Sequence, residues 1–483
     1  LMEFQQDTEA LSSIAGRLGW DQETMMPKGA ANQRAIEQAA IIKTIHSRKI
    51  DPRIPEWIDK IRPQNEIEEA NIRHIKKTYQ KALKVPPDLS AAIARTTSKA
   101  HGVWASAREN EDVAEYLPIL TEIINLKRQK AEALTKAGNY YDALADEYEP
   151  GMSTIDISMM FEELRPTLVG LRKEILADDK IPSVTNNFDK NTQLKLAKEL
   201  AVTFGYDLNK GRIDLSLHPF SSGCGDDVRI TTRIDPSDPF NCIYSTIHEV
   251  GHATYEQNIK KDYIFSPLGR GVSLGVHESQ SRIFENQLGR SRAFTHWLFH
   301  RMTSLFGDFG IKDAETFYKC VNQVNSSYIR TEADELQYNL HVMLRFDLEK
   351  LLISGDLAVK DLEGAWNERF EADFGYKVKK PSQGVLQDVH WAAGAFGYFP
   401  TYTLGNVYAG CLFQKMNVDI PNLDDVLSTG IISQATAWLR ENIQVHGSLF
   451  EPRATIEQAT GAEITVKPFL NYIEKKYKDI YNL

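Results

Sequence analysis

Helical periodicity runs through most of this chain and limits its fold more than any other feature. Apolar residues recur every three or four positions in long segments, as in helices that bury one face. The predicted helices cover residues 66–83, 118–136, 156–177, 190–204, 312–325, 329–353 and 422–441. Clusters of proline and glycine predict turns at residues 86–87, 150–151, 381–384 and 397–405. No low-complexity linker interrupts the pattern, so we expect one mostly α domain over residues 1–483, with two lobes around a groove.

One region breaks the helical pattern. Apolar and polar residues alternate over 213–217 and again over 227–231, and Gly223 and Gly225 lie between the two runs. This pattern predicts a β-hairpin of about 20 residues. Its exposed edge could pair with an extended peptide. The alternative is a purely structural ribbon.

A five-residue motif, H-E-V-G-H, follows this hairpin. Asp238 and Pro239 predict the cap and first residue of a helix, on which His248 and His252 share one face. Two imidazoles one turn apart can hold one divalent metal ion. Glu249 between them could then take a proton from a bound water molecule. The alternative is a pair of core histidines that bond to their neighbours.

The third metal ligand is predicted in the next helical run. Glu278 stands in V-H-E-S-Q-S, 26 residues after His252 (278 − 252), where it would complete a His₂Glu site of the gluzincin type. Glu285 could orient His248 or His252 from behind, or it could be a solvated glutamate. We expect one ion per chain, with Zn²⁺ as first choice and Co²⁺ or Mn²⁺ as alternatives.

A polar stripe marks the helix predicted over residues 329–353. At about 100° per residue its members fall within an arc of about 80°. They are Arg330, Asp334, Tyr338, His341 and Arg345. A solvated stripe would favour lysine and glutamate, so this mixture indicates the lining of a polar cleft. The alternative is a surface stripe of ion pairs.

A further cluster follows in two short segments rich in aromatic residues. Residues 384–391 read G-V-L-Q-D-V-H-W, and residues 397–402 read G-Y-F-P-T-Y. These segments suit the wall of a site, where His390 or Tyr402 could donate a hydrogen bond to an oxyanion. The alternative is an aromatic loop that caps a core.

Charge and cysteine usage exclude several classes of protein. Acidic residues outnumber basic ones by 66 to 56 and no basic block occurs, which argues against a nucleic-acid partner. No apolar run approaches the roughly 20 residues of a membrane span. The four cysteines are scattered without a C-x-x-C pair, and no signal peptide is visible, so we expect a cytoplasmic protein with inert thiols.

Taken together, these segments resemble the thermostable (Taq-type) metallocarboxypeptidase family. The family's marks are H-P-F, D-x-R-x-T, H-E-x-x-H, H-E-S-Q, I-R-x-x-A-D and G-x-x-Q-D-x-H-W. All of them occur here in that order, at 218–220, 227–231, 248–252, 277–280, 329–334 and 384–391. The likeness extends from the segment L-G-W-D-Q-E-T at 18–24 across nearly the whole chain.

The resemblance implies a neurolysin-like helical body with a long active-site groove and a small β-sheet near the metal helix. It implies a homodimer that removes C-terminal residues from peptide substrates with broad specificity, using Zn²⁺ or Co²⁺. By motif, His248, His252 and Glu278 are the metal ligands, and Glu249 is the general base and acid.

An exopeptidase must also recognise the free carboxylate of its substrate, for which a guanidinium group is well suited. Arg330 is the first candidate and Arg229 the second, and each could instead be held in an ion pair, with Asp334 or Asp227 respectively. His218, from the H-P-F motif, and Asp334 are further candidates for substrate binding.

Two other functions compete with this prediction. A zinc oligoendopeptidase of the neurolysin type would share the helical groove and the metal site but would need no carboxylate clamp. A non-catalytic peptide- or metal-binding protein would have no use for Glu249, so the intact glutamate argues against it.

Overall fold

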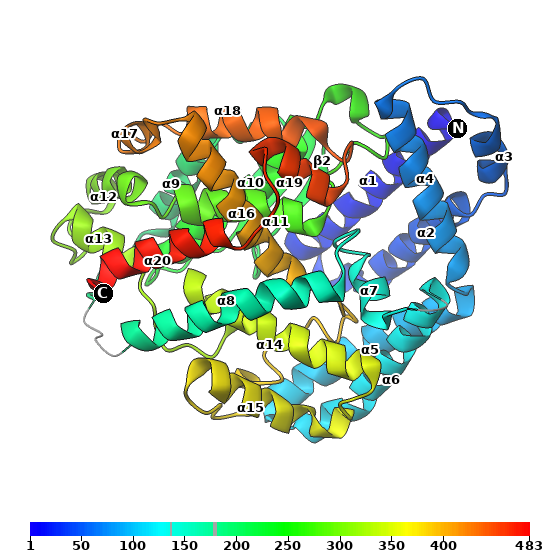
Figure 1. Ribbon diagram of the computed structural model, residues 1–483, viewed down its shortest axis with the longest axis horizontal. Helices are drawn as coiled ribbons and strands as arrows, with labels where there is room; N and C mark the ends of the chain where they lie inside the picture. The colour runs from blue at the N-terminus through cyan, green and yellow to red at the C-terminus, as the bar shows by residue number, and fades with distance from the viewer. Residues whose placement is uncertain (136–137, 177–180) are drawn as a thin grey trace. The chain divides into compact units, whose positions relative to one another are not determined.

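The computed structural model describes residues 1–135, 138–176 and 181–483 (Figure 1). The chain divides into two compact units. Unit 1 consists of Leu1–Ala82, Ile181–Asn322 and Tyr408–Ile464, and unit 2 of Leu83–Lys180, Gln323–Val407 and Thr465–Leu483. Because each unit combines three stretches, neither is a continuous segment of the sequence. The single domain with a groove stays a prediction.

Unit 1 contains the motif helix and the small sheet. Its helices are α1 (Met2–Thr24), α2 (Ala31–Lys49), α3 (Arg53–Lys60), α4 (Glu66–Lys84), α9 (Lys190–Thr203), α10 (Pro239–Asn258), α11 (Leu274–Arg282), α12 (Arg292–Phe306), α13 (Ala314–Val321), α17 (Leu423–Leu427), α18 (Ser433–Asn442) and α19 (Pro452–Thr460). Short 3₁₀ turns are η1 (Lys28–Ala30), η2 (Lys261–Tyr263) and η7 (Gln444–His446). Helix α16 (Pro400–Asp419) begins in unit 2 and ends in unit 1.

A three-stranded sheet packs against α10. Strand β3 (Asp227–Thr232) lies in the middle, with β1 (Ile213–Leu215) parallel to it and β2 (Ser221–Cys224) antiparallel to it. The hydroxyl of Thr246 on α10 donates to the hydroxyl of Thr232 on β3 at 2.9 Å. This buried bond fixes the sheet next to the motif helix.

The predicted hairpin was wrong in its pairing. Residues 213–217 contribute a parallel edge strand, and the actual hairpin joins β2 to β3 through a two-residue turn at Gly225 and Asp226. Gly225 has a φ of 61°, which glycine adopts without steric cost. Strand β2 reads Ser-Ser-Gly-Cys, so it lacks the apolar alternation that would have revealed it.

Helix α10 starts as the sequence predicts. The carboxylate of Asp238 accepts a hydrogen bond from the backbone N–H of Phe240, and Pro239 occupies the first helical position. Ile247 and Val250 on this helix are fully buried. The predicted start of the motif helix is therefore confirmed.

Helix α11 continues directly into a π-helical segment, η3 (Ile283–Leu288). The hydroxyl of Ser273 caps α11 by accepting from the backbone N–H of Val276 at 3.1 Å. In Figure 1, α10 and α11 are drawn in green, and the two helices pack against each other. A π-helical turn is rare and occurs mostly at functional sites.

Unit 2 is built around helix α14. Its helices are α5 (Pro87–Asn110), α6 (Val113–Leu134), α7 (Tyr140–Ala145), α8 (Thr154–Ile175), α14 (Glu335–Ser354), α15 (Leu362–Phe374) and α20 (Lys467–Tyr481), with 3₁₀ turns η4 (Arg330–Glu332), η5 (Val359–Asp361) and η6 (Pro381–Gln383). Helix α14 packs against α6, α7, α8 and α15. It is buried on nearly every side, including the polar side chains of His341, Arg345 and Glu349. Buried polar groups of this kind require partners.

The prediction of a polar helical stripe over residues 329–353 was wrong for the first turn of that segment. Arg330 lies in η4, outside the helix, and Asp334 is the N-cap residue of α14. The Asp334 carboxylate accepts hydrogen bonds from the backbone N–H groups of Leu336 and Gln337. An aspartate that caps these N–H groups starts a helix instead of continuing one, so Asp334 does not share a helical face with the stripe.

Other predicted boundaries also shift. The helix predicted over 422–441 is interrupted, since Gly430 adopts a φ of 80° between α17 and α18. The turn predicted over 397–405 ends early, because Pro400 begins α16. Helix α6 is capped by Asp112 and begins at Val113, five residues before the expected start at Pro118 (118 − 113). The segment expected over 312–325 is shorter, with α13 ending at Val321.

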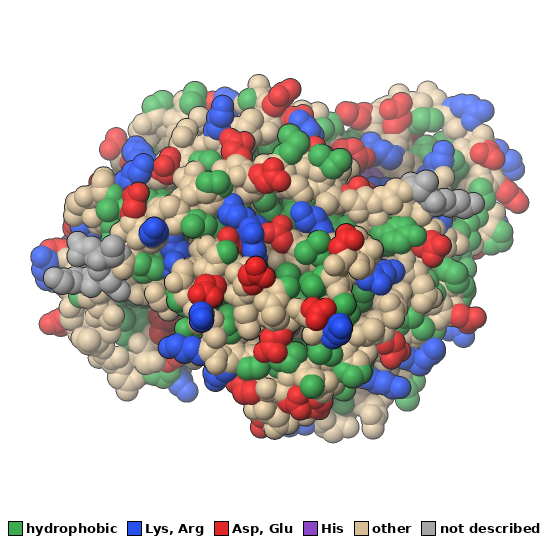
Figure 2. All heavy atoms as spheres, turned by 60° about the horizontal axis from the view of Figure 1, so that its bottom comes forward, with side chains coloured by type: hydrophobic (Ala, Val, Ile, Leu, Met, Phe, Trp, Pro, Cys, Tyr) green, Lys and Arg blue, Asp and Glu red, His purple; other side chains and the backbone are tan. Residues whose placement is uncertain are grey.

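The surface agrees with a chain of mixed charge. On the face shown in Figure 2, the described acidic and basic side chains are interspersed. Among the described residues, no helix combines the length and apolarity that a membrane span requires. Cys224, Cys242, Cys320 and Cys411 form no disulfide bond with one another.

Candidate metal centre

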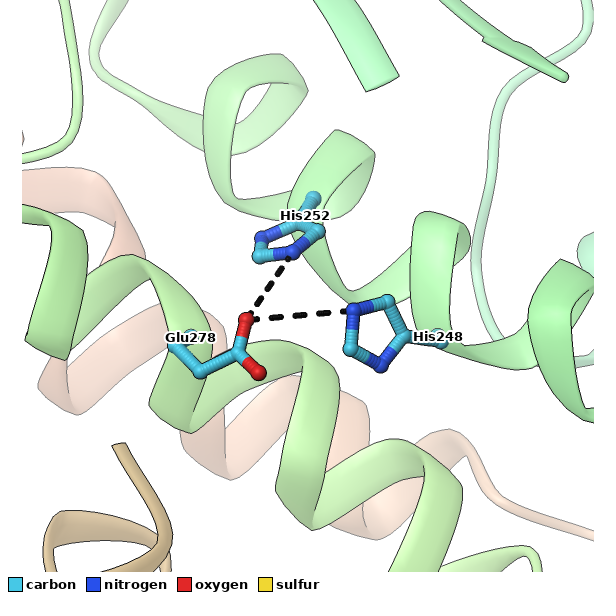
Figure 3. Close-up of side chains that lie close together, drawn as sticks. All are labelled: His248, His252 and Glu278. Carbon is cyan, nitrogen blue, oxygen red and sulfur yellow. Dashed lines mark ion pairs between the residues drawn. The ribbon is translucent and has the colours of Figure 1, made fainter. Parts of the chain in front are cut away.

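The two motif histidines meet Glu278 at one point of unit 1. His248 and His252 occupy successive turns of α10, with ring centroids 4.9 Å apart. The Oε2 atom of Glu278, on α11, lies 3.8 Å from Nε2 of His248 and 3.4 Å from Nε2 of His252 (Figure 3). All three ligand atoms fall within 4.8 Å of one another. Sequence spacing alone had selected these three side chains.

This geometry fits a divalent ion. A tetrahedral ion with bonds of about 2.1 Å holds its ligand atoms about 3.4 Å apart. The two distances from Glu278 to the histidines are close to that value. Two imidazoles and one carboxylate also leave the fourth position open. Within the part of the chain that the structure describes, no other group of three or more His, Cys, Asp or Glu side chains meets in this way.

Gly251 allows Glu278 to reach the histidines. A Cβ atom at this position would lie 2.5 Å from the carbonyl oxygen of Gln280 and 2.5 Å from Cα of Ser281, both on α11. Glycine therefore permits the backbones of α10 and α11 to come into close contact. Gly251 was not among the predicted site residues, although an isolated glycine inside a helix often has a packing reason.

Glu285 supports His248 through Nδ1, the ring nitrogen that does not face Glu278. Its Oε2 atom lies 2.9 Å from Nδ1 of His248, so of the two candidate histidines it contacts this one. Arg282 and Arg290 lie 3.3 Å and 3.5 Å from the carboxylate. Burial raises the pKa of Glu285, but the bond to His248 and the charge of Arg282 outweigh it and lower the pKa to about 2. The ionised carboxylate accepts the Nδ1 proton and leaves Nε2 as a lone pair for a metal ion.

Glu278 is held as an ionised carboxylate. Arg282 donates from Nε to its Oε1 atom at 2.7 Å, and Ser281 donates from its hydroxyl to Oε2 at 3.2 Å. Burial favours the neutral acid, but Arg282 and the histidines outweigh it and lower the pKa of Glu278 below its ordinary value. The guanidinium occupies Oε1, so Oε2 faces the two histidines.

His252 has a different support. Its Nδ1 lies 2.6 Å from Nδ1 of His277, and Nε2 of His277 lies 2.9 Å from Oε1 of Glu256. Burial lowers the pKa of His252 to about 4, which keeps its imidazole neutral. Glu256 was not among the predicted site residues, although its position four residues after His252 places it on the same helical face.

Glu249 is buried beside the ligand set. Only 6% of its surface is exposed, and burial raises its pKa to about 7, with added repulsion from Glu278 and Glu285. Acidic side chains outnumber basic ones in this region, which favours a divalent cation. The acidic side chains are Glu249, Glu256, Glu278 and Glu285, and the basic ones are Arg282 and Arg290.

Arg330 belongs to a buried ion-pair cluster of unit 2. Its Nη2 and Nε donate to the two oxygens of Asp388 at 2.9 and 3.2 Å, and its Nη1 donates to the Tyr338 hydroxyl at 2.9 Å. Arg345 pairs with the same carboxylate at 2.5 Å. Burial raises the pKa of Asp388, but the two guanidinium groups outweigh it and hold the pKa well below its ordinary range. The ion-pair alternative for Arg330 named Asp334 as the partner, but the observed partner is Asp388.

His390 and Tyr402 lie close together at the edge of this cluster. Nε2 of His390 is 3.4 Å from the Tyr402 hydroxyl, and Nδ1 is 3.7 Å from Asp388. Burial lowers the pKa of His390 to about 4 and raises that of Tyr402 well above its ordinary value. Both side chains are therefore neutral. His341 packs on the ring of Phe374 at 4.6 Å instead of lining a polar cleft.

The other two substrate candidates lie in unit 1. Arg229 donates to both oxygens of Asp227 at 2.7 and 2.9 Å and stacks over the ring of Trp20, so the ion-pair alternative is the one observed. His218 is exposed, and its carbonyl oxygen accepts from the hydroxyl of Ser216. None of the described hydrogen bonds or ion pairs joins Arg229 or His218 to the three metal-site side chains.

Fold and site together define a class of protein. A mostly helical chain with a His₂Glu set, an open fourth position and a buried glutamate next to it belongs to the metal-dependent hydrolases.

Comparisons with known proteins identify the family. A family model described as Carboxypeptidase Taq (M32) metallopeptidase matches residues 1–477. The chain is 41% identical to Thermostable carboxypeptidase 1 of Thermus thermophilus, over 100% of this chain and 98% of that protein. It is 35% identical to Thermostable carboxypeptidase 1 of Pyrococcus furiosus, over 97% and 96%.

Solved structures agree with this assignment. The M32 carboxypeptidase from Deinococcus radiodurans has a TM-score of 0.96 at 35% identity, over 100% of this chain and 99% of that one. Metallocarboxypeptidase 1 of Trypanosoma cruzi has a TM-score of 0.94 at 31% identity, over 99% and 100%.

The chain belongs to the Carboxypeptidase Taq (M32) metallopeptidase family. It is a metal-dependent carboxypeptidase, so the zinc oligoendopeptidase and the non-catalytic binding protein are not supported. The expected mostly α-helical body with a small sheet beside the motif helix is confirmed.

Proposed function

We propose that His248, His252 and Glu278 bind one divalent ion, with Zn²⁺ as first choice and Co²⁺ or Mn²⁺ as alternatives. Glu249 is then the group that moves protons during cleavage. The enzyme releases C-terminal amino acids from peptides with broad specificity. The observation that carries this proposal is the burial of Glu249 beside three side chains whose ligand atoms lie within 4.8 Å of one another.

The chemistry divides between the ion and the protein. When bound, a divalent ion lowers the pKa of water and polarises a peptide carbonyl. Glu249 accepts a proton from the attacking water and later donates it to the leaving amine. Burial raises the pKa of Glu249 to about 7, which suits a group that must both accept and donate a proton near neutral pH. Glu285 and Arg282 keep His248 and Glu278 in place during these steps.

Four residues are proposed to take part in binding the substrate. Arg330 remains the first candidate for the substrate carboxylate, and its bonds to Asp388 and Tyr338 account for three of its five N–H groups. Arg229 and His218 are the candidates from unit 1. Asp334 is a weaker candidate for substrate binding, because its carboxylate caps α14.

Tyr402 and His390 are proposed as hydrogen-bond donors to the oxyanion. Both are neutral, so each can offer a proton without a change of charge.

A pair of peptides tests the exopeptidase proposal. The two share one sequence, and one ends in a free carboxylate while its twin ends in an amide. We expect the free acid to lose its C-terminal residue and the amide to react at least about 100-fold more slowly, because it lacks the charge that a guanidinium pairs with. Equal values of kcat/KM for the two peptides, or cleavage in their interior, would contradict the proposal.

Three further predictions accompany this function. The homodimer follows from the family resemblance, and the single domain over residues 1–483 follows from the absence of a low-complexity linker. The cytoplasmic location follows from cysteine usage. Sedimentation equilibrium would test the dimer directly.

A further inference from the structure

The second nitrogen of His252 is bonded to another histidine, and a chain of contacts continues from there. Nδ1 of His252 lies 2.6 Å from Nδ1 of His277, and Nε2 of His277 lies 2.9 Å from Oε1 of Glu256. Metal-binding histidines usually donate directly to a carboxylate or a carbonyl group, as His248 does to Glu285. His252 thus reaches its carboxylate only through an intermediate ring.

The Glu256 carboxylate determines the direction of every bond in this chain. A carboxylate oxygen accepts hydrogen bonds, so Nε2 of His277 donates to Oε1 of Glu256, and in a ring with a single proton Nδ1 is then the lone pair. The short contact at 2.6 Å then requires His252 to donate from Nδ1. Nε2 of His252 is left as a lone pair, and this is the atom that faces Glu278 at 3.4 Å.

The loop before α11 holds this arrangement. The backbone N–H of Gly271 donates to the same Oε1 atom at 2.9 Å. A Cβ atom on Gly271 would lie 2.6 Å from Cδ2 of His277 and 3.0 Å from Cε1 of Tyr255. Only glycine therefore lets the loop lie against the ring of His277 and bond to Glu256 at the same time.

The burial of the Glu256 carboxylate costs free energy that its own hydrogen bonds do not fully offset. The side chain is only 8% exposed, and its buried Oε2 atom has no hydrogen-bond partner among the residues that the structure describes. A buried carboxylate oxygen in this state is unfavourable compared with an apolar side chain of the same size. Such a group is retained where it performs a task, and the task visible here is the orientation of His277.

We propose that Glu256, acting through His277, is a positioning residue that fixes the metal-binding tautomer of His252. The inference rests on the proposed metal role of His248, His252 and Glu278. It assigns Glu256 and His277 no contact with the substrate. Removing the acceptor at position 256 lets His277 adopt either tautomer, so His252 no longer presents Nε2 to the ion in every molecule.

A pair of substitutions isolates the acceptor from the charge. Glu256→Met removes the acceptor in a side chain of similar size, and Glu256→Gln keeps an Oε1 acceptor without the charge. We expect Zn²⁺ affinity, measured by competition with a chelator, to fall about 10- to 100-fold in Glu256→Met. Glu256→Gln should restore most of the loss. Wild-type affinity in Glu256→Met would overturn the inference.

Two controls keep the measurement specific. His296 and His300 are exposed on α12 with ring centroids 4.9 Å apart and could bind a stray ion, so all variants carry His296→Ala and His300→Ala. The melting temperature of the metal-free protein should stay closer to the wild-type value in Glu256→Gln than in Glu256→Met, because the amide oxygen still accepts from Gly271 and His277.

A spectroscopic test on the wild-type protein needs no variant at position 256. In protein labelled with ¹⁵N at histidine and freed of metal, the nitrogen shifts should show the Nδ1–H tautomer for His252 and the Nε2–H tautomer for His277. The opposite tautomers would overturn the inference. If wild-type protein binds no stoichiometric Zn²⁺ but shows these tautomers, the metal proposal fails and the bonding argument stands.

Discussion

The absent side chain of Gly251 leaves room for the carbonyl oxygen of Gln280, which would lie 2.5 Å from a Cβ atom built there. This contact sets the separation of α10 and α11, and therefore the distance from the motif histidines to Glu278. Neither Val250 nor Gly251 of the motif can act as a ligand or a base, and Val250 is buried in the core. The contribution of Gly251 is to the packing of the two helices.

Gly251→Ala should therefore disrupt the site without touching a ligand. The added methyl group meets backbone atoms that cannot rotate away, so we expect a loss of about 1–3 kcal/mol in the free energy of unfolding. Zn²⁺ affinity should fall in the same variant. Gly16→Ala in α1 is the matched control, since no atom lies within 4 Å of a Cβ there and alanine favours a helix. If both variants kept wild-type affinity, Gly251 would have no packing role.

Glu249→Gln should abolish most activity and spare metal binding. The amide has nearly the same shape as the carboxylate but cannot accept and return a proton. We expect kcat to fall about 10²- to 10⁴-fold. Metal content, measured by elemental analysis, should equal that of the wild-type protein. Retention of wild-type kcat would exclude Glu249 as the proton-transfer group.

Asp388→Asn should destabilise unit 2 strongly. The substitution leaves Arg330 and Arg345, which are 4% and 0% exposed, without their shared counter-charge. Breaking a buried ion pair in this way costs about 3–5 kcal/mol. The control is Asp227→Asn, where the partially exposed pair with Arg229 should contribute less than about 1 kcal/mol. Equal losses in urea unfolding would contradict the distinction.

The raised pKa of Glu349 predicts that the free energy of unfolding depends on pH. This residue of α14 is fully buried and accepts from Tyr141, Trp391 and the N–H of Gly397, yet burial raises its pKa to about 7. The unfolded chain releases the proton near the ordinary pKa of 4.5, so the folded state binds more protons between these two values. The contribution of Glu349 to stability therefore falls as the pH rises from about 4.5 to about 7.

Glu349→Gln removes this titration. The difference in unfolding free energy between wild type and variant should change by about 3 kcal/mol across that pH window, with the wild type losing stability relative to the variant. Urea unfolding at a series of pH values measures the difference, and every other titrating group contributes equally to both proteins. Parallel stability curves would show that Glu349 does not titrate in this range.

A local capping signal was accurate where the sequence analysis used it. Asp238 and Pro239 located the start of α10 because a cap requires only adjacent residues. Helical periodicity alone gave a wrong start for α14, because periodicity does not reveal that Asp334 caps the helix. Strand β2 was missed because its four residues carry no apolar alternation and depend on pairing with β3.

The sequence by itself determined the helical class. It also selected His248, Glu249, His252 and Glu278 as the candidate site residues, because helical spacing and residue chemistry suffice for that selection. Only the tertiary structure decided which groups support them. Glu285 bonds to His248, whereas Glu256 reaches His252 through His277. Arg330 pairs with Asp388, 58 residues away, instead of with Asp334. The physical reason is that hydrogen bonds between segments distant in sequence form only where packing brings the two backbones close enough, as at Gly251. No local sequence pattern encodes that distance.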